Sequence, residues 1–365
     1  MPTLVFTVTN ELSFDQRMQR ICGSLHRAGY EVRLIGRNMK GSSSLPKLPF
    51  KQVRLNCFSA KGPLFYLEFN CRLFLYLLFQ KADLICAIDL DTILACYFAS
   101  ALKGSKRVYD AHEYFTEQKE VATRPLIKKI WLAIERFAVP RFQWGYTVNQ
   151  WIADAFRTHY DVSYETIRNM PLNRPYEGKQ SEERYILYQG AVNEGRCFEQ
   201  LIPAMLEVPV PLKIYGNGNF INQTKSIIYN NLLEYKIELN EPLLPSILKE
   251  KTGQAYIGIT LFDDLGLSQV HSLANRFFDY IMAGIPQLCI DFPEYRIMNQ
   301  EWEVAYLIPD TDPKTIAAAL NKLLDDSVLY NKLRLNCWEA RKHLNWDSEE
   351  KQLIAFYERI FQSTN

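Results

Sequence analysis

Short apolar segments alternate with longer helical patterns along the whole chain. Such alternation is typical of parallel β-sheets, because neighbouring parallel strands need a crossover helix between them. The first series of expected strands covers residues 4–9, 31–36, 53–57, 84–88, 107–110, 145–148 and 166–167. The second series covers residues 185–189, 212–215, 255–259, 287–289 and 305–308. The pattern predicts an α/β fold with two Rossmann-like, doubly wound parallel-sheet domains facing a cleft.

A polar, proline-bearing stretch without apolar periodicity separates the two series and predicts a linker. At 365 residues, the chain is also long enough for two domains. The expected division is an N-terminal domain over 1–168, a linker over 169–182, a second domain over 183–345 and a final helix over 346–365.

Composition excludes several classes of protein. The 42 basic and 41 acidic residues nearly cancel, which argues against a nucleic-acid binder held by bulk charge. The eight cysteines include no CxxC pair, so neither a zinc site nor a disulfide framework is expected. The most apolar window, 64–79, is interrupted by polar residues and is too short to span a bilayer. A soluble cytoplasmic protein without a metal site is expected.

The stretch SQVHSLANRFFDYIMAGIPQLCIDFP, residues 268–293, is the most informative part of the chain. A polar loop opens onto a helix that carries Asp279, and Gly284 and Pro286 mark the end of that helix. A strand follows. A nucleotide can bind at such a loop and helix start, although an ordinary αβ unit has the same pattern.

Two glycine-bearing loops follow the first strands of the second domain. In YQGAVNEGR, Gly190 permits a sharp turn, and Gly195 and Arg196 precede a helix, which suits a diphosphate. In YGNGN, Gly216 and Asn217 form a tight loop that could approach a base or ribose, or be a plain turn.

In the first domain, VYDAHEYF places His112 just past a strand, at the sheet edge where ligands bind in open α/β folds. The segment AIDLDT contains Asp89 and Asp91; we expect Asp91 to cap the following helix, and the role of Asp89 stays open.

The first strand is followed by a loop and helix start without a GxGxxG motif, which disfavours a nicotinamide dehydrogenase. Asn10, Asp15 and Arg17 cluster there as candidates for facing the cleft. Alternatively, Asp15 caps the helix and Arg17 is solvated.

The segments NELSFDQRMQRI, YDAHEYF, YQGAVNEGR, YGNGN and SLANRFFDYIMAGIPQL, in this order, resemble the GT-B retaining glycosyltransferases of the glycosyl transferases group 1, family 4-like set. The resemblance implies a donor domain that follows an acceptor domain, and a last helix, from Asp347, that crosses back to the first domain. It also implies transfer of a sugar from a nucleoside-diphosphate sugar, UDP- or GDP-linked, to a hydroxyl acceptor. The acceptor class is polysaccharide, glycolipid or lipid-linked saccharide, and the transfer is retaining and metal-independent, without a cofactor.

The resemblance also assigns roles to residues. Asp279 holds the ribose, Arg196 and Arg276 the diphosphate, and His112 contacts the donor sugar. The donor-binding candidates are Gly190, Asn193, Gly195, Gly216, Asn217, Ser272, Leu273, Ala274, Asn275, Arg276 and Asp279. The catalytic candidates are His112, Arg196 and His271, and those on the acceptor side are Asn10, Asp15, Arg17 and Asp89.

This chain departs from the resembled family at several positions. His271 and Asp279 stand where many relatives carry two glutamates separated by seven residues. Ser272-Leu273-Ala274 stands in place of Gly-Phe-Gly, and Ala191 stands in place of an arginine. Alternative functions are a nucleotide-sugar 2-epimerase or a phosphorylase on the same fold, or a non-catalytic nucleotide-sugar-binding partner.

Residues 124–144 form a basic and aromatic segment. Its charged and aromatic members are Arg124, Lys128, Lys129, Trp131, Arg136 and Arg141. They could rest on anionic lipid at the inner face of a membrane, or belong to a helix whose apolar side is packed and whose lysines are solvated.

Overall fold

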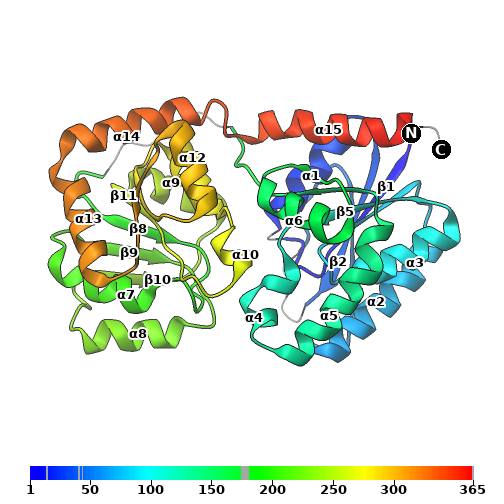
Figure 1. Ribbon diagram of the computed structural model, residues 1–365, viewed down its shortest axis with the longest axis horizontal. Helices are drawn as coiled ribbons and strands as arrows, with labels where there is room; N and C mark the ends of the chain where they lie inside the picture. Colours follow the sequence, from blue (N-terminus) through cyan, green and yellow to red (C-terminus); the bar gives the residue numbers. More distant parts are fainter. Residues whose placement is uncertain (14, 40–41, 43, 174–180, 364–365) are drawn as a thin grey trace. The chain divides into compact units, whose positions relative to one another are not determined.

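The computed structural model describes residues 1–13, 15–39, 42, 44–173 and 181–363. It divides into two compact units (Figure 1), coloured along the sequence from blue to red. Unit 1 comprises Met1–Asn169 and Glu349–Asn365, and unit 2 comprises Met170–Ser348. Residues 174–180 of the predicted linker lie outside the described residues.

Unit 1 is built on a seven-stranded parallel sheet with the order β3-β2-β1-β4-β5-β6-β7. Its strands are β1 (Thr3–Thr7), β2 (Glu31–Asn38), β3 (Lys51–Asn56), β4 (Leu84–Ile88), β5 (Lys106–Ala111), β6 (Trp144–Thr147) and β7 (Glu165–Thr166). Its helices are α1 (Gln16–Arg27), α2 (Pro63–Leu78), α3 (Ile93–Lys103), α4 (Lys119–Ala122), α5 (Pro125–Ala138) and α6 (Gln150–Tyr160), with α15 (Trp346–Gln362) joining from Glu349 onward.

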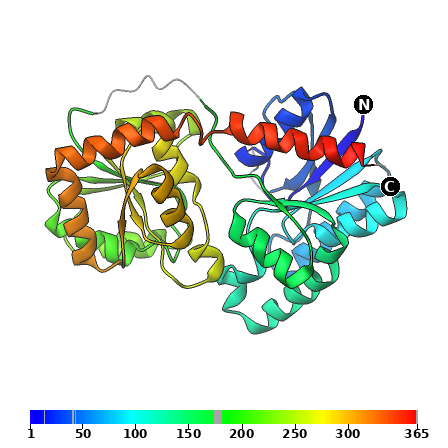
Figure 2. The ribbon, with the colours of Figure 1, turned by 45° about the horizontal axis from the view of Figure 1, so that its top comes forward.

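Side chains alternate along each strand of unit 1, so each face of its sheet carries apolar side chains. Helices cover both of these faces. Val5 of β1 belongs to the core formed with Phe69 and Leu73 of α2. Its neighbour Phe6 points the other way and meets Tyr357 of α15, with ring centroids 6.0 Å apart. The red helix in Figure 2 is α15, which lies along the unit 1 strands. The end of the chain therefore completes the core of the unit in which the chain begins.

Unit 2 contains a six-stranded parallel sheet with the order β10-β9-β8-β11-β12-β13. Its strands are β8 (Ile186–Gln189), β9 (Leu212–Tyr215), β10 (Ile237–Asn240), β11 (Ile257–Thr260), β12 (Gln287–Ile290) and β13 (Ala305–Ile308). Its helices are α7 (Phe198–Ala204), α8 (Ile221–Asn230), α9 (Pro245–Gln254), α10 (Leu267–Val270), α11 (Asn275–Ala283), α12 (Pro293–Trp302), α13 (Pro313–Asp325) and α14 (Ser327–Ala340).

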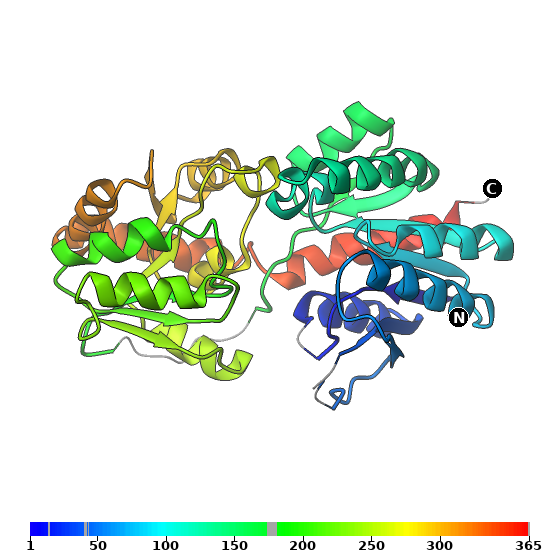
Figure 3. The same cartoon turned by 90° about the horizontal axis from the view of Figure 1, so that it is seen from below.

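Alternation along β8 shows how unit 2 is layered. Tyr188 packs against Phe198 of α7 on one face, and Leu187 shares a cluster with Tyr280 of α11 on the other. Figure 3 shows these strands from below, with helices on both sides. Strand β10 and helix α12 were not expected from the sequence; the predicted α/β class with two doubly wound parallel sheets is confirmed.

No helix within the described ranges is long and apolar enough to cross a membrane.

Candidate functional site

In unit 2, the direction of the strand order reverses between β8 and β11. Ligands of open α/β sheets bind outside the carboxyl ends of the strands at such a switch point. Most predicted donor-binding residues lie in the loops that leave these strand ends or at the start of α11. The topology therefore brings segments of unit 2 that are far apart in sequence to one edge of its sheet.

The loops after β8 and β9 pack directly on one another. A Cβ on Gly216 would lie 1.9 Å from the carbonyl oxygen of Gly190, and one on Gly218 would lie 2.3 Å from that of Val192. The Asn193 side-chain oxygen accepts a hydrogen bond from the Asn219 backbone N–H at 3.0 Å. The two loops of the chain itself make the close approach that these glycines permit, and a hydrogen bond joins them.

The loop after β11 is fastened to the loop after β8. The Gln269 amide donates to the carbonyl oxygen of Gly195 at 3.0 Å and to the Asp263 carboxylate at 2.6 Å. The Asp263 backbone N–H also donates to the Gly195 carbonyl oxygen at 3.1 Å. Gly195 has a φ of 84°, a left-handed conformation that favours glycine. These bonds fix the turn that carries Arg196.

Arg276 is a buried cation in the first turn of α11. Its side chain is 7% exposed, and its guanidinium lies 4.5 Å from the ring centroid of Tyr188 and 4.7 Å from that of Phe262. Nη1 donates to the carbonyl oxygen of Gln189 at 3.3 Å, while the buried Nε has no hydrogen-bond partner among the described residues. No described carboxylate lies within salt-bridge distance of it.

Arg196 approaches the same aromatic ring. Its guanidinium lies 4.4 Å from the Phe262 centroid, so Phe262 contacts both Arg196 and Arg276. Burial alone would lower the pKa of Arg276, but the surrounding tyrosines, led by Tyr188, raise it above its usual value. Two guanidinium groups held on one ring form a positively charged site suited to an anion.

Asp279 lies one turn further along α11. Its carboxylate accepts a hydrogen bond from the Gln189 side-chain amide at 3.0 Å. Gln189 is itself oriented by Thr252, whose hydroxyl donates to its side-chain oxygen at 2.6 Å. Arg196, Arg276 and Asp279 are thus connected through Phe262 and Gln189 at one sheet edge.

The segment ahead of α11 carries the remaining predicted donor residues. His271 ends α10, and burial lowers its pKa. The Ser272 hydroxyl donates to the Gln269 carbonyl oxygen at 2.9 Å, and the Ala274 backbone N–H donates to the Tyr295 hydroxyl at 3.0 Å. Leu273 packs on the core, and Asn275 is exposed at the helix start. The Ala274 backbone N–H therefore already donates its hydrogen bond within the protein. No side chain caps the start of α11.

In unit 1, the predicted acceptor residues have mostly structural partners. Asp15 is the N-cap of α1 and accepts from the Met18 backbone N–H at 3.0 Å, and the Asn10 amide donates to Asp15 at 3.0 Å. Arg17 is not solvated, because it forms a buried salt bridge of 2.7 Å with Asp110 of β5. The capping alternative for Asp15 is correct, and the solvated alternative for Arg17 is wrong.

Asp89 and His112 lie together at the carboxyl edge of β4 and β5. The Asp89 carboxylate accepts from the His112 backbone N–H at 3.0 Å and lies 3.7 Å from its Nδ1. Burial lowers the pKa of His112, but the bond and charge of Asp89 outweigh it and raise the pKa to about 9. His112 is therefore an imidazolium at neutral pH.

The expected cap at Asp91 is wrong. Helix α3 begins at Ile93 with Thr92 as N-cap and no side-chain capping bond. The Asp91 carboxylate instead accepts from the Thr9 hydroxyl. Burial and the nearby Asp89 raise the pKa of Asp91 to about 7.

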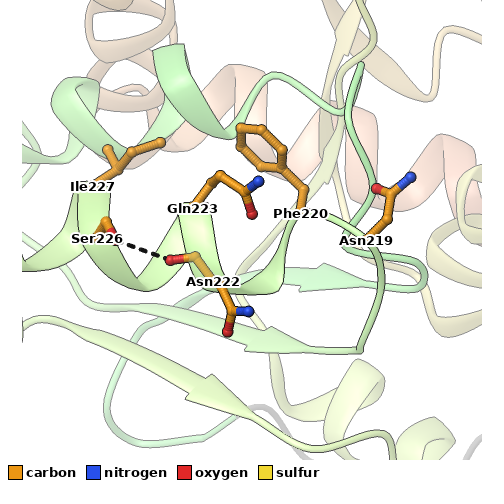
Figure 4. Close-up of a pocket in the computed structure, with 6 residues that line it drawn as sticks. All are labelled: Asn219, Phe220, Asn222, Gln223, Ser226 and Ile227. Atoms are coloured by element: carbon orange, nitrogen blue, oxygen red, sulfur yellow. Dashed lines mark hydrogen bonds between the residues drawn. The ribbon is translucent and has the colours of Figure 1, made fainter.

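A further hollow lies on the surface of α8 (Figure 4). Its volume is about 550 Å³, and the side chains that line it are Asn219, Phe220, Asn222, Gln223, Ser226 and Ile227. Among these residues, the Ser226 hydroxyl donates to the backbone carbonyl oxygen of Asn222, one turn earlier on α8, at 3.1 Å. None of the predicted site residues lines it.

Sequence reasoning did not single out Gln189, Phe262 or Thr252. Gln189 and Phe262 contact predicted site residues, and Thr252 contacts Gln189. Gln189 carried a signal, since it is a polar side chain at the end of an apolar strand at the expected binding edge. Phe262 and Thr252 carried no such signal, because an aromatic residue after a strand and a threonine in a helix are ordinary core positions.

The chain is similar to known proteins in part of its sequence and in its fold. A family model described as Glycosyltransferase Family 4 matches residues 16–171. A comparison with curated proteins finds no match. The chain is similar to sucrose-phosphate synthase from Thermosynechococcus elongatus, with a TM-score of 0.83 and 14% identity over 100% of both chains. It is also similar to HepE from Anabaena in complex with UDP-glucose, with a TM-score of 0.74 and 10% identity over 98% of this chain and 100% of that one.

A third solved structure is a candidate UDP-N-acetylglucosamine 2-epimerase from Listeria monocytogenes, with a TM-score of 0.66 and 12% identity over 100% of this chain and 97% of that one. At these identities the likeness concerns the fold. This chain has the α/β fold of the GT-B glycosyltransferases.

Proposed function

We propose that this chain is a glycosyltransferase that moves a sugar from a nucleoside-diphosphate sugar to a hydroxyl acceptor. The observation that carries the proposal is Arg276, a buried guanidinium beside Arg196 at the switch point of unit 2, with no described carboxylate in salt-bridge distance. A diphosphate would supply the missing negative charge. The Glycosyltransferase Family 4 match and the UDP-glucose complex of HepE support the same proposal.

The proposed reaction is retaining and metal-independent, with a UDP- or GDP-linked sugar as donor. Cleavage of the sugar–phosphate bond leaves growing negative charge on the diphosphate. Arg276 and Arg196 would stabilise this charge, and pre-aimed donors of this kind are worth roughly 3 kcal/mol each. Asp279 would accept hydrogen bonds from the ribose hydroxyls. The acceptor would be a saccharide or a lipid-linked saccharide.

A ligand screen followed by a turnover assay tests the proposal. UDP-, GDP- and ADP-sugars are compared by thermal shift, since a ligand at about 100 times its Kd stabilises by about 2.7 kcal/mol. The donor that binds is then incubated with saccharide and lipid-linked acceptors, with and without EDTA, while nucleoside-diphosphate release and product anomer are followed. Release that survives EDTA, with the anomer retained, is expected. Binding without release would instead indicate a non-catalytic nucleotide-sugar-binding partner.

The similarity to the candidate 2-epimerase motivates one alternative enzyme. A 2-epimerase acts on the nucleotide sugar alone, whereas a transferase needs an acceptor. Proton NMR of UDP-N-acetylglucosamine incubated with the protein in D₂O separates the two. Deuterium at C2 without an acceptor would favour the epimerase.

We also propose that the charged form of His112 takes part in donor turnover. Asp89 keeps His112 protonated up to a pKa of about 9, so activity that needs the imidazolium is present below that pH and lost above it. In Asp89→Asn, burial and the repulsion from Arg17 still lower the pKa of His112, and they outweigh the smaller influence of Glu113, which raises it. The alkaline limb of the kcat/KM profile should move from about pH 9 to below the ordinary histidine value of 6.5.

Asp154→Asn, at an exposed position on α6 in the same unit, serves as the control and should keep the wild-type profile. An unchanged alkaline limb in Asp89→Asn would remove His112 from the mechanism.

We further propose that an apolar and basic surface of unit 1 rests on anionic lipid. On α5, Leu126 is 80% and Ile130 62% exposed, among the exposed Arg124 and Lys129. Exposed Phe98 of α3 stacks on Phe137 of α5, which extends the apolar area. Trp131 is not part of this surface, because it packs on Tyr66 and Phe115.

Vesicle co-sedimentation tests this contact. Binding to vesicles with phosphatidylglycerol should exceed binding to pure phosphatidylcholine, and Ile130→Glu should reduce it at least severalfold, because a buried charge and lipid repulsion both oppose docking. Leu335→Glu, at a 65% exposed position on α14, introduces the same charge in unit 2 and should not change binding. Equal binding to both kinds of vesicle would contradict the proposal.

A further inference from the structure

Gln189 bonds to both charged side chains of α11 in the candidate site, the Arg276 guanidinium and the Asp279 carboxylate. Its backbone carbonyl oxygen accepts from Arg276, and its side-chain amide donates to Asp279. The Thr252 hydroxyl donates to the other end of the same side chain, so the amide orientation is defined by its partners. Gln189 is 4% exposed, and its position is fixed by the end of β8.

Arg276 and Asp279 are three residues apart on α11, a spacing at which opposite charges on a helix can pair. Within the described ranges, however, no salt bridge joins them. Each instead bonds to a different part of Gln189. An internal pair would neutralise both groups, so a residue that keeps them apart preserves the charge of each.

The need for such support is increased by the short side chain at position 279. Aspartate has only one methylene group, so its carboxylate stays close to the helix. The Gln189 amide on β8 then holds one of its two oxygens in place.

We propose that Gln189, oriented by Thr252, is a positioning residue that holds the Asp279 carboxylate apart from Arg276 and in place for the ribose hydroxyls of a bound nucleotide. The inference rests on the proposed function. Its consequence is that Gln189, which does not touch the nucleotide in this scheme, sets how strongly the protein prefers a ribose over a deoxyribose.

Calorimetric titration of Gln189→Leu tests the inference. UDP and GDP are compared with their 2′-deoxy and 3′-deoxy analogues. In the wild type, loss of a hydroxyl that bonds to a carboxylate should weaken binding roughly ten- to a hundredfold. In Gln189→Leu the penalty should fall below about threefold, because Asp279 turns toward Arg276.

The chain offers a matched control in Gln287. This buried glutamine of β12 also accepts from a threonine hydroxyl, that of Thr260, at 2.8 Å, but its amide donates to the Phe277 carbonyl oxygen at 3.0 Å. Gln287→Leu removes an equivalent buried amide without touching Asp279, and should keep the deoxy penalty. Thr252→Val should reduce the penalty, and Thr252→Ser should restore it.

Three results would overturn the inference alone. The first is a wild type that binds nucleotides without preferring ribose, and the second is a Gln189→Leu variant with the full wild-type penalty. An equal loss of the penalty in Gln287→Leu would do the same, since the effect would then be general. A wild type that binds neither UDP nor GDP would contradict the proposed function itself, and the inference would fall with it. Circular dichroism confirms that each variant is folded.

Discussion

Replacing Arg276 by methionine is expected to lower kcat/KM for nucleotide-sugar turnover by roughly a hundred- to a thousandfold, the usual cost of removing one pre-aimed donor to a developing anion. Methionine is unbranched and apolar, so it can fill the space between Tyr188 and Phe262. The variant therefore removes the charge while keeping the packing. Steady-state kinetics with the donor found in the screen gives the measurement.

Stability separates a functional role of Arg276 from a structural one. A buried cation that lacks a carboxylate partner costs free energy, so Arg276→Met should leave the unfolding midpoint unchanged or raise it. Arg296→Met is the matched control, because Arg296 is an exposed arginine of α12 that pairs with Asp291. It should keep wild-type kinetics. Wild-type turnover in Arg276→Met, or a large fall in its midpoint, would contradict the anion site.

Sequence periodicity was sufficient for the sheets because most strands are continuous apolar runs bounded by turns. Strand β10 is the exception, since it lies at the edge of its sheet and Glu238 on it is exposed. Its apolar signal is therefore weak, as expected for a strand with one neighbour. Helix α12 was missed because Pro293, at its first turn, follows an acidic segment that was interpreted as a simple turn.

The candidate site was predicted in part for a related reason. Arg196, Arg276 and Asp279 follow strand ends or begin a helix, so the topology alone brings them to one sheet edge. Phe262 and Gln189 connect them through contacts between strands that no local pattern reports. Arg17 shows the same limit: its partner Asp110 is 93 residues away in the sequence.

The ion pair of Arg17 with Asp110 gives the largest expected effect on stability. Both side chains are buried, at 5% and 0% exposed, and their shortest N···O distance is 2.7 Å. Asp110→Ala leaves the guanidinium buried without its partner, which should lower the free energy of unfolding by roughly 3 to 5 kcal/mol. For a unit of this size the unfolding midpoint should fall by roughly 6 to 20 °C, which differential scanning calorimetry measures.

The sign of the pKa shift predicts what removal of both partners does. Burial raises the pKa of Asp110 more than Arg17 lowers it, so its folded value exceeds the ordinary 3.8. Ionised Asp110 is thus less favourable in the folded state than in the unfolded state, and this cost is present at pH values above the folded pKa. The double variant Arg17→Met with Asp110→Leu should therefore be about as stable as the wild type. Arg359→Ala, which breaks an exposed pair with Glu165 in the same unit, should cost less than about 1 kcal/mol. A double variant as unstable as Asp110→Ala would contradict this expectation. It would show that the ion pair makes unit 1 more stable than two apolar side chains in its place.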